Sequence, residues 1–306
     1  MSAKGGSAVG GKILILGAKG NLGQQLVKVF SGQENTSATL GAGEVIAWDR
    51  EEIDITDREL IIKKIDDIKP EVIINAAAYN NVDKCEDSDE EYELAKKVNI
   101  DGPKFLAEAG LKVGAILVHY STNYVFDGEK KEGYIENDEA KPINRYGKTK
   151  FHGEKRILEQ SGSGLKWYLI RTSKLFGPEG QSKFTKPTFF DTMLESSKTK
   201  KVIEVVNEEV SCYTYTPDLA QATKELILSG KGNGIYHLIN QGAGSWYQAA
   251  VELFNLAGID IKVVPISSDE LKRPAKRPKY SILINTKLPL LRDYREALKE
   301  YLNLKQ

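Results

Sequence analysis

Short apolar runs alternate with amphipathic segments along the first half of the chain. Runs rich in Val, Ile and Leu predict strands over 12–16, 44–48, 71–75, 114–121 and 166–172. Segments with apolar residues three and four positions apart predict helices over 21–30, 58–68, 90–110 and 144–160. Strands that alternate with helices are typical of a parallel sheet covered on both faces. The pattern therefore predicts an α/β fold with a doubly wound parallel sheet of the Rossmann type.

The second half of the chain has a looser pattern. Residues 177–187 are rich in Gly, Pro and polar residues and predict a long loop. Later elements are expected to be strands over 202–206 and 234–239 and helices over 189–197, 217–228, 245–257 and 293–302. We expect Thr216 to cap the helix over 217–228, Ser245 to cap the helix over 245–257, and Gly258 to end the latter. This gives a flexible leader (1–11), a first domain (12–173) and a smaller α/β domain (mostly 174–306), with segments such as 211–240 able to return to the first domain.

A glycine-rich loop lies between the first predicted strand and the first predicted helix. Gly17, Gly20 and Gly23 allow a tight turn and a close approach to a pyrophosphate, whose charge then lies at the helix N-terminus. The spacing is GxxGxxG and not GxGxxG, but the strand before it and the helix after it are the context that such a loop requires. The first domain is therefore predicted to bind a nicotinamide dinucleotide.

Residues after the second strand leave the choice of dinucleotide open. Asp49 lies where an acid would meet the ribose hydroxyls of NADH, and Arg50 beside it could instead neutralise the 2′-phosphate of NADPH. The cofactor is therefore predicted to be NADPH or NADH.

Tyr146 and Lys150 form the strongest catalytic candidate. They are four residues apart at the start of a predicted helix, so they share one face. A free tyrosine has a pKa of about 10, and a neighbouring ammonium favours its phenolate. Thr122 follows the fourth strand, where its hydroxyl can hydrogen-bond a substrate carbonyl together with Tyr146. The order of glycine loop, Thr122 and then YxxxK is more specific than any of these features alone.

Composition excludes several other classes of protein. Acidic and basic residues balance at 43 each, which leaves no excess positive charge for nucleic acid. Cys85 and Cys212 lie far apart, and no two histidines have metal-ligand spacing, so neither a disulfide framework nor a metal site is expected. No apolar run is long enough to cross a bilayer, and the leader lacks the apolar centre of a signal peptide. A cytoplasmic protein without a membrane partner is expected, with a homodimer as the commonest assembly.

With these residues in place, the chain resembles the extended short-chain dehydrogenase/reductase superfamily and, within it, the dTDP-4-dehydrorhamnose reductase family. The matching segments run through nearly the whole chain after the leader: GAKGNLGQQL, DITD, EVIINAAAYNNVDKCE, VNIDGPKFLAEA, HYSTNYVFDG, NRYGKTKFHGE, LIRTSKLFG and RPKYSIL. The resemblance implies that Tyr146 is the proton donor, that Lys150 activates it and binds ribose, and that Thr122 orients the carbonyl. It implies a cofactor site that includes the glycine loop and Asn21, Leu22, Asp49, Arg50, Asp54, Ile55, Ala77, Ala78, Tyr79 and Asn99.

The chain departs from this family at two positions that face the substrate. Asn123 replaces the aspartate of the usual STDYVF, and Lys174 replaces the aromatic residue of the usual RTSW. The substrate implied is a nucleotide-linked 4-keto-6-deoxy sugar, bound by Thr122, Asn123 and Lys174, and these changes leave the identity of the sugar open. Trp246 and the basic run from Lys272 to Arg277 are further candidates for contacting an anionic substrate.

Two other functions remain open at this point. One is a related nucleotide-sugar 4-epimerase or ketoreductase. The other is a non-catalytic regulatory subunit that resembles the methionine adenosyltransferase β subunit.

Overall fold

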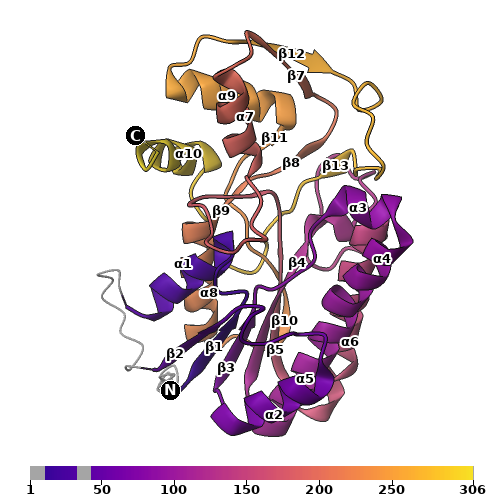
Figure 1. Ribbon diagram of the computed structural model, residues 1–306, viewed down its shortest axis with the longest axis vertical. Coiled ribbons are helices and arrows are strands. Elements are labelled where there is room, and N and C mark those ends of the chain that lie inside the picture. Colours follow the sequence, from indigo (N-terminus) through magenta and orange to yellow (C-terminus); the bar gives the residue numbers. More distant parts are fainter. Residues whose placement is uncertain (1–10, 33–42, 306) are drawn as a thin grey trace.

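A six-stranded parallel sheet forms the centre of the lower part of the molecule in Figure 1. The computed structural model describes residues 11–32 and 43–305, so most of the predicted leader (1–10) lies outside the described residues. The strand order is β10-β5-β4-β3-β1-β2. The strands are β1 (Ile13–Leu16), β2 (Val45–Trp48), β3 (Val72–Asn75), β4 (Ile116–Thr122), β5 (Lys166–Thr172) and β10 (Gly234–His237). The predicted α/β fold is confirmed, and the strand order reverses between β1 and β3, where such sheets bind ligands.

Helices cover both faces of this sheet because successive residues of each strand point to opposite sides. Ile13 and Ile15 pack on one face against α1 (Asn21–Phe30) and α8 (Thr216–Leu228). Leu14 and Leu16 pack on the other face, which is covered by α2 (Arg58–Ile68), α5 (Gly102–Val113) and α6 (Arg145–Glu159). Both α8 and β10 come from the later half of the chain, yet they lie against α1 and β5. The division of the chain at residue 173 stays a prediction.

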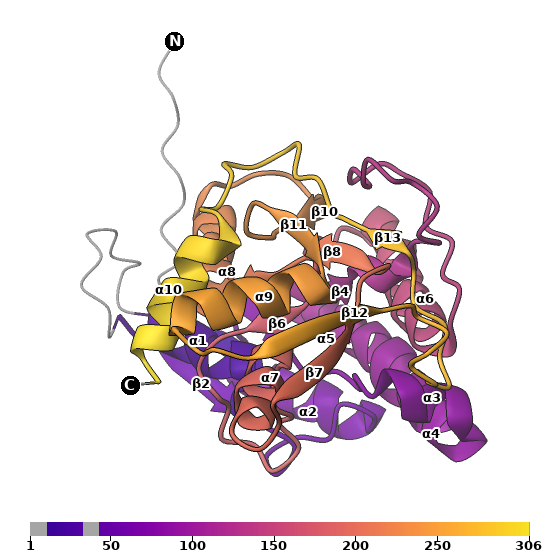
Figure 2. The ribbon, with the colours of Figure 1, turned by 90° about the horizontal axis from the view of Figure 1, so that it is seen from above.

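A smaller α/β unit lies above the carboxyl edge of the main sheet (Figures 1 and 2). Its helices are α7 (Phe189–Ser197), α9 (Trp246–Ala257) and α10 (Tyr294–Asn303). Its short strands are β6 (Leu175–Phe176), β7 (Val202–Val206), β8 (Val210–Cys212), β9 (Thr214–Tyr215), β11 (Ala243–Ser245), β12 (Lys262–Ile266) and β13 (Tyr280–Ser281). Aromatic side chains such as Phe176, Phe190, Tyr213 and Tyr301 fill its separate core. No helix within the described ranges is long and apolar enough to cross a membrane.

The predicted helix over 90–110 is interrupted. It divides into α4 (Asp89–Lys96), a π-helical turn over Lys97–Asp101, and α5, and a short α3 (Val82–Asp87) precedes it. Short 3-10 turns lie over Asn123–Val125 and Ser161–Ser163. The π turn places Asn99, whose side chain is buried, against the loop after β3 and against α6. Apolar periodicity does not reveal such a turn, because the residues on both sides keep a helical pattern.

The predicted helix caps are correct at α9 and wrong at α8. Ser245 accepts from the Gln248 amide in a capping box, and Gly258 ends α9 with a φ of 65°. Thr216 lies inside α8, and Tyr215 precedes the helix. The Thr216 hydroxyl is buried without a hydrogen-bond partner among the described residues. It is enclosed by Gly177, where an added Cβ would lie 2.2 Å from that hydroxyl.

Candidate active site

The glycine loop is packed as tightly as a phosphate-binding turn requires. Gly17 has a φ of +74°, and a side chain there would lie 2.8 Å from the amide nitrogen of Ala77, after β3. A Cβ on Gly23 would lie 1.9 Å from the Gly17 carbonyl oxygen, so only glycine lets α1 approach β1 this closely. Gly20 precedes α1, and no side chain caps the helix amides there. These features fit a dinucleotide pyrophosphate at the start of α1.

The long loop predicted over 177–187 lies over the glycine loop, a contact that the sequence did not indicate. Residues 177–187, which we call the strap, follow β6. The amides of Gln181 and Ser182 donate to the Lys19 carbonyl at 2.7 and 2.9 Å. The Gly180 amide donates to Asn21 Oδ1 at 2.8 Å, so the Asn21 side chain faces the strap. The contact joins residues about 160 positions apart, and neither periodicity nor a local motif marks it.

The expected adenosine end of the site is only partly available. The Asp49 carboxylate accepts from the backbone amides of Lys19 and Arg50 at 2.9 and 2.7 Å, so it ties β2 to the glycine loop. The Arg50 guanidinium lies over the Phe184 ring of the strap, 5.3 Å from its centroid. The Asp54 carboxylate binds Thr56. Of these three candidates, Arg50 keeps guanidinium donors without a hydrogen bond among the described residues, because the contact with Phe184 uses only the face of its guanidinium.

The remaining predicted cofactor residues differ in accessibility. Leu22 and Ile55 are buried in the two cores of the main sheet. The Ala77 amide donates to the Asn75 side chain, and Ala78 is exposed. The Asn99 side chain bonds the backbone of Tyr79 through both its oxygen and its nitrogen, and it also donates to Thr149 Oγ1. Asn99 therefore braces the loop that carries Tyr79 against α6.

Thr122 and Tyr146 lie together at the carboxyl edge of the sheet. Thr122 ends β4, and its hydroxyl donates to Asn123 Oδ1 and accepts from the Tyr124 amide, each at 3.2 Å. The same hydroxyl lies close enough to the Tyr146 phenol to lower its pKa. Tyr146 is in the first turn of α6, where Asn144 caps the helix by accepting from Gly147. A Cβ at Gly147 would lie 2.2 Å from the Tyr124 carbonyl oxygen, so the glycine allows α6 to approach this edge.

Burial raises the pKa of the Tyr146 phenol above its usual value, and the neighbouring Thr122 hydroxyl offsets part of that increase. In this structure the Lys150 amine does not contact the phenol; it donates to the Tyr120 carbonyl at 2.7 Å. Burial lowers the pKa of Lys150 to about 8, while the Glu154 carboxylate acts in the opposite direction. Glu154 itself forms a buried bidentate ion pair with Arg171, at 2.9 and 2.7 Å. The ammonium effect that we expected on Tyr146 stays a prediction.

Asn123 joins the sheet edge to the smaller unit. Its amide nitrogen donates to Ser211 Oγ at 3.0 Å and to Ser281 Oγ at 2.8 Å, and Ser211 in turn hydrogen-bonds Ser173 at 2.7 Å. Because the amide nitrogen is enclosed by these hydroxyls, Asn123 positions β8 and β13 beside Thr122. The three serines come from separate segments. Ser173 and Ser281 lie in the family-like segments LIRTSKLFG and RPKYSIL, but no local spacing indicates that either serine lies near Asn123.

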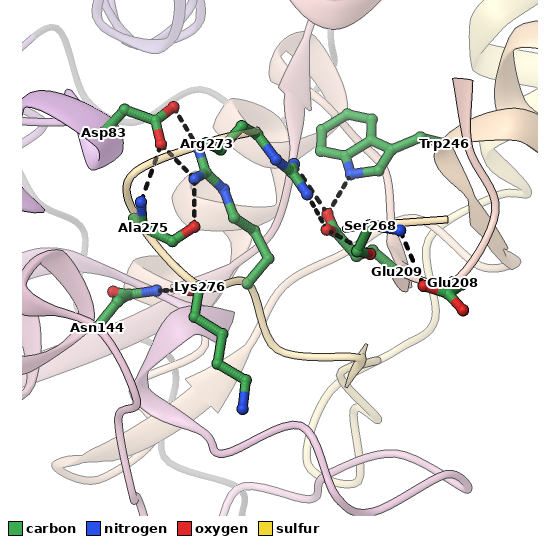
Figure 3. A network of polar contacts seen from close by, with 10 residues as sticks. Asp83, Asn144, Glu208, Glu209, Trp246, Ser268, Arg273, Ala275 and Lys276 are labelled. Carbon is green, nitrogen blue, oxygen red and sulfur yellow. Dashed lines mark hydrogen bonds and ion pairs between the residues drawn. The ribbon is translucent and has the colours of Figure 1, made fainter. Parts of the chain in front are cut away.

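A polar network lines the other side of this edge (Figure 3). Glu209 accepts from the guanidinium of Arg273, from the Trp246 indole at 3.0 Å and from the Ser268 hydroxyl at 3.1 Å. Arg277 forms an ion pair with Asp83 of α3. Two arginines of the predicted basic run are therefore neutralised by acids. The Lys276 side chain points away from both pairs (Figure 3).

Tyr124 links this network to Tyr146. Its ring meets the Tyr146 ring edge-to-face with centroids 6.0 Å apart. Burial raises the pKa of Tyr124, and the charges of Arg277, Glu209 and Arg273 all act on it. Tyr124 therefore connects the Glu209 network to Tyr146 at this edge of the sheet.

The match to known proteins covers the whole of this arrangement. A family model described as "RmlD substrate binding domain" matches residues 11–306. A dTDP-4-dehydrorhamnose reductase of Aggregatibacter actinomycetemcomitans is 36% identical, over 90% of this chain and 92% of that protein. The spore coat polysaccharide biosynthesis protein SpsK of Bacillus subtilis is 33% identical, over 95% of this chain and 96% of its own length.

Solved structures agree with this match. The dTDP-4-dehydrorhamnose reductase of Clostridium acetobutylicum has a TM-score of 0.85 and 42% identity, over 96% of this chain and 99% of that one. The enzyme of Bacillus anthracis, solved in complex with NADP, has the same TM-score of 0.85, 32% identity and the same coverage of 96% and 99%. The chain therefore belongs to the dTDP-4-dehydrorhamnose reductase family, within the extended short-chain dehydrogenase/reductase fold.

Proposed function

We propose that this protein uses NADPH or NADH to reduce the C4 ketone of a nucleotide-linked 4-keto-6-deoxy sugar, as a step in dTDP-L-rhamnose biosynthesis in the cytoplasm. The observation that carries the proposal is that the Thr122 hydroxyl and the Tyr146 phenol lie together beside buried Lys150 at the carboxyl edge of the main sheet. The glycine loop follows β1 at the same edge. Known relatives with this fold are named as reductases of dTDP-linked keto sugars.

The residues of this chain suit both halves of the reaction. The glycine loop and the start of α1 would hold the pyrophosphate, and Lys150 would hold the nicotinamide ribose. When bound, a reduced nicotinamide supplies the hydride. Tyr146 donates its proton to the ketone oxygen, and the Thr122 hydroxyl hydrogen-bonds the same oxygen. Because its pKa is raised, Tyr146 is protonated before turnover, as a proton donor must be.

The Lys150 amine has further N–H groups besides the one that it donates to Tyr120. One can meet ribose and another can stabilise the Tyr146 phenolate after proton transfer, so the activation expected from the sequence would take effect once the site is filled. The alanines after β3 are small enough for a flat ring to lie against the backbone there.

The proposal is tested by following the absorbance of NADPH, and then of NADH, with dTDP-4-keto-6-deoxyglucose in the presence and absence of its 3,5-epimerase. Oxidation only with the epimerase supports a reductase of the rhamnose pathway. Oxidation without it supports a 4-ketoreductase that makes another deoxysugar, an activity that one relative from Streptomyces niveus carries in its name.

The remaining outcomes contradict the proposal. Bound NAD that survives purification, with interconversion of C4 epimers and no net oxidation, would establish an epimerase. Nucleotide binding without any turnover would favour a regulatory subunit. Gel filtration and light scattering would test the homodimer that we propose for the assembly.

A further inference from the structure

Lys174 carries a buried amine with no hydrogen-bond partner among the described residues. Its Nζ lies 3.4 Å from the centroid of the Trp246 ring and 5.2 Å from that of Tyr213. The backbone of Lys174 is left-handed, with a φ of 35°, a conformation that side chains other than glycine and asparagine adopt at a cost. Lys174 therefore combines a strained backbone with a buried amine that lacks a hydrogen bond. Each of these two features lowers the stability of the fold.

The acid whose charge acts most strongly on this amine, Glu209, forms no ion pair with it among the described residues. The Glu209 carboxylate is already bound by Arg273, the Trp246 indole and Ser268. These bonds fix the Trp246 ring as a wall against the amine. Burial lowers the pKa of Lys174 to about 7; Glu209 and the Cys212 thiol act to raise it, and Arg273 acts to lower it further. The amine is therefore ready to bind an acceptor that the protein itself does not provide.

The space beside the amine is small and otherwise apolar. A cavity of about 60 Å³ lies there, lined by Phe176, Phe189, Phe190, Tyr213 and Trp246 as well as by Lys174. A cavity of this size admits a substituent of a few atoms and not a whole sugar. Most of the lining is apolar, and Lys174 is the one charged residue among the residues that line the cavity. A polar atom that enters can therefore meet the Lys174 amine if the side chain turns slightly toward it.

Lys174 also lies next to the proposed reaction centre. It is two residues beyond Thr172, which pairs with Thr122 across β5 and β4. Ser173 connects through Ser211 to Asn123, beside Thr122. On the other side, the charges of Glu209 and Arg273 act on both Lys174 and Tyr124, whose ring meets Tyr146.

We propose that Lys174 is the specificity-determining residue of the sugar subsite, and that it hydrogen-bonds a hydroxyl or carbonyl oxygen on a ring carbon one or two positions from the C4 ketone. This inference rests on the proposed reductase function and deepens it. A sugar that lacks this oxygen leaves the amine buried and unpaired, and a site built to bond a polar group rejects the analogue without it more strongly than a purely apolar pocket does.

The test compares kcat/KM for dTDP-4-keto-6-deoxyglucose with kcat/KM for its 2-deoxy and 3-deoxy analogues, each measured with an excess of the 3,5-epimerase. The native enzyme should prefer the parent sugar over at least one analogue by about tenfold or more. Lys174→Met should reduce that preference to about twofold or less, because the thioether cannot donate a hydrogen bond. Lys174→Gln should restore part of it. Lys200→Met, at an exposed lysine, is the matched control and should keep the native preference.

A second readout does not depend on turnover. Calorimetry with NADP⁺-saturated enzyme near pH 8, in two buffers of different ionisation enthalpy, measures proton uptake on binding dTDP-rhamnose and dTDP. The sugar nucleotide should cause more uptake than dTDP in the native protein, because an acceptor favours the charged amine, and Lys174→Met should abolish the difference. Melting temperatures confirm that the variants are folded.

Two results would overturn the inference: an undiminished preference in Lys174→Met, or equal proton uptake with dTDP-rhamnose and dTDP in the native protein. A failure of the proposed function looks different. No keto sugar would then oxidise the cofactor, while the calorimetric comparison would still report on Lys174.

Discussion

Two buried lysines lie at opposite sides of the candidate site, and their surroundings differ. Lys150 has a pKa lowered to about 8, donates to the Tyr120 carbonyl and lies near the Glu154 carboxylate. Lys174 has a pKa lowered to about 7 and has no such partner among the described residues. The Lys150 amine, on the side formed by the main sheet and α6, already has a hydrogen-bond acceptor. The Lys174 amine, on the side formed by the smaller unit, has none among the described residues. The difference suits Lys150 to a fixed place beside the reacting groups, and it suits Lys174 to binding an acceptor on a ligand.

The largest expected effect comes from the Lys150 side. Tyr146→Phe removes the proposed proton donor and keeps the ring that packs on Tyr124. We expect kcat to fall about 10²- to 10⁴-fold, the usual contribution of a general acid. Cofactor affinity, measured by quenching of protein fluorescence, should stay within about twofold, because the phenol hydroxyl is assigned to the ketone and not to the cofactor. For scale, a loss of about 1.4 kcal/mol in binding free energy would be tenfold. Normal turnover, or loss of cofactor binding, would contradict the role assigned to Tyr146.

The next largest effect is expected at Glu209, which supports the Lys174 side of the site. Glu209→Gln leaves Arg273, whose side chain is only 19% exposed, without its ion-pair partner. Breaking a buried pair costs about 3–5 kcal/mol, and the partial exposure reduces the expected loss of unfolding free energy to about 2–3 kcal/mol. Urea unfolding measures it. The control, Glu195→Gln, breaks an exposed pair with Lys198 and should cost less than about 1 kcal/mol. Equal losses would show that Glu209 does not hold this side together.

A smaller effect is expected where the strap contacts the glycine loop. Gly180→Ala would place a Cβ 2.7 Å from the Asn21 nitrogen and the Lys19 carbonyl oxygen. The strap would have to shift away from the glycine loop, at a cost of about 1–3 kcal/mol as for other overpacked sites. Gly162→Ala, where nothing lies within 4 Å, is the control. A strap that tolerates alanine with no change in melting temperature or cofactor affinity would mean that its contact is dispensable.

The last prediction concerns pH dependence. The folded chain binds fewer protons at Lys174 than the unfolded chain between about pH 7 and the ordinary lysine pKa of about 10.4. Stability from this residue therefore rises with pH across that window. Lys174→Met should be more stable than the native protein near pH 6.5, and its advantage should shrink toward pH 9. Lys200→Met should follow the native curve of melting temperature, and so would Lys174→Met if the amine were not buried.

Elements defined by local pattern were predictable from the sequence. The helices Arg58–Ile68 and Phe189–Ser197 and the strand Lys166–Thr172 have the predicted bounds, because apolar spacing and the adjacent breakers determine them. The π turn at Asn99 was missed because one extra residue in a turn hardly changes that spacing. At Thr216 a good capping residue is buried inside the helix, because packing against Gly177 outweighs local preference.

The candidate site divides along the same line. Gly17, Tyr146 and Lys150 belong to motifs with fixed local spacing, so the sequence reveals them and the structure places them at one edge. The bonds of Asn123 to Ser211 and Ser281, and the contact of Lys174 with Trp246, join segments that are far apart along the chain. The local sequence pattern does not indicate which serine will contact Asn123 or which indole will contact Lys174. Their roles follow only from the folded arrangement.

Hydrogen exchange in the strap can report whether the strap is docked on the glycine loop. Gln181 and Ser182 lie in a surface loop, where amide protons ordinarily exchange quickly with solvent. Here both donate to one carbonyl of the glycine loop, so their exchange is slowed for as long as the strap remains docked. Deuterium uptake by these two amides would therefore follow undocking directly. It would show whether nucleotide entry requires the strap to leave or takes place beneath it.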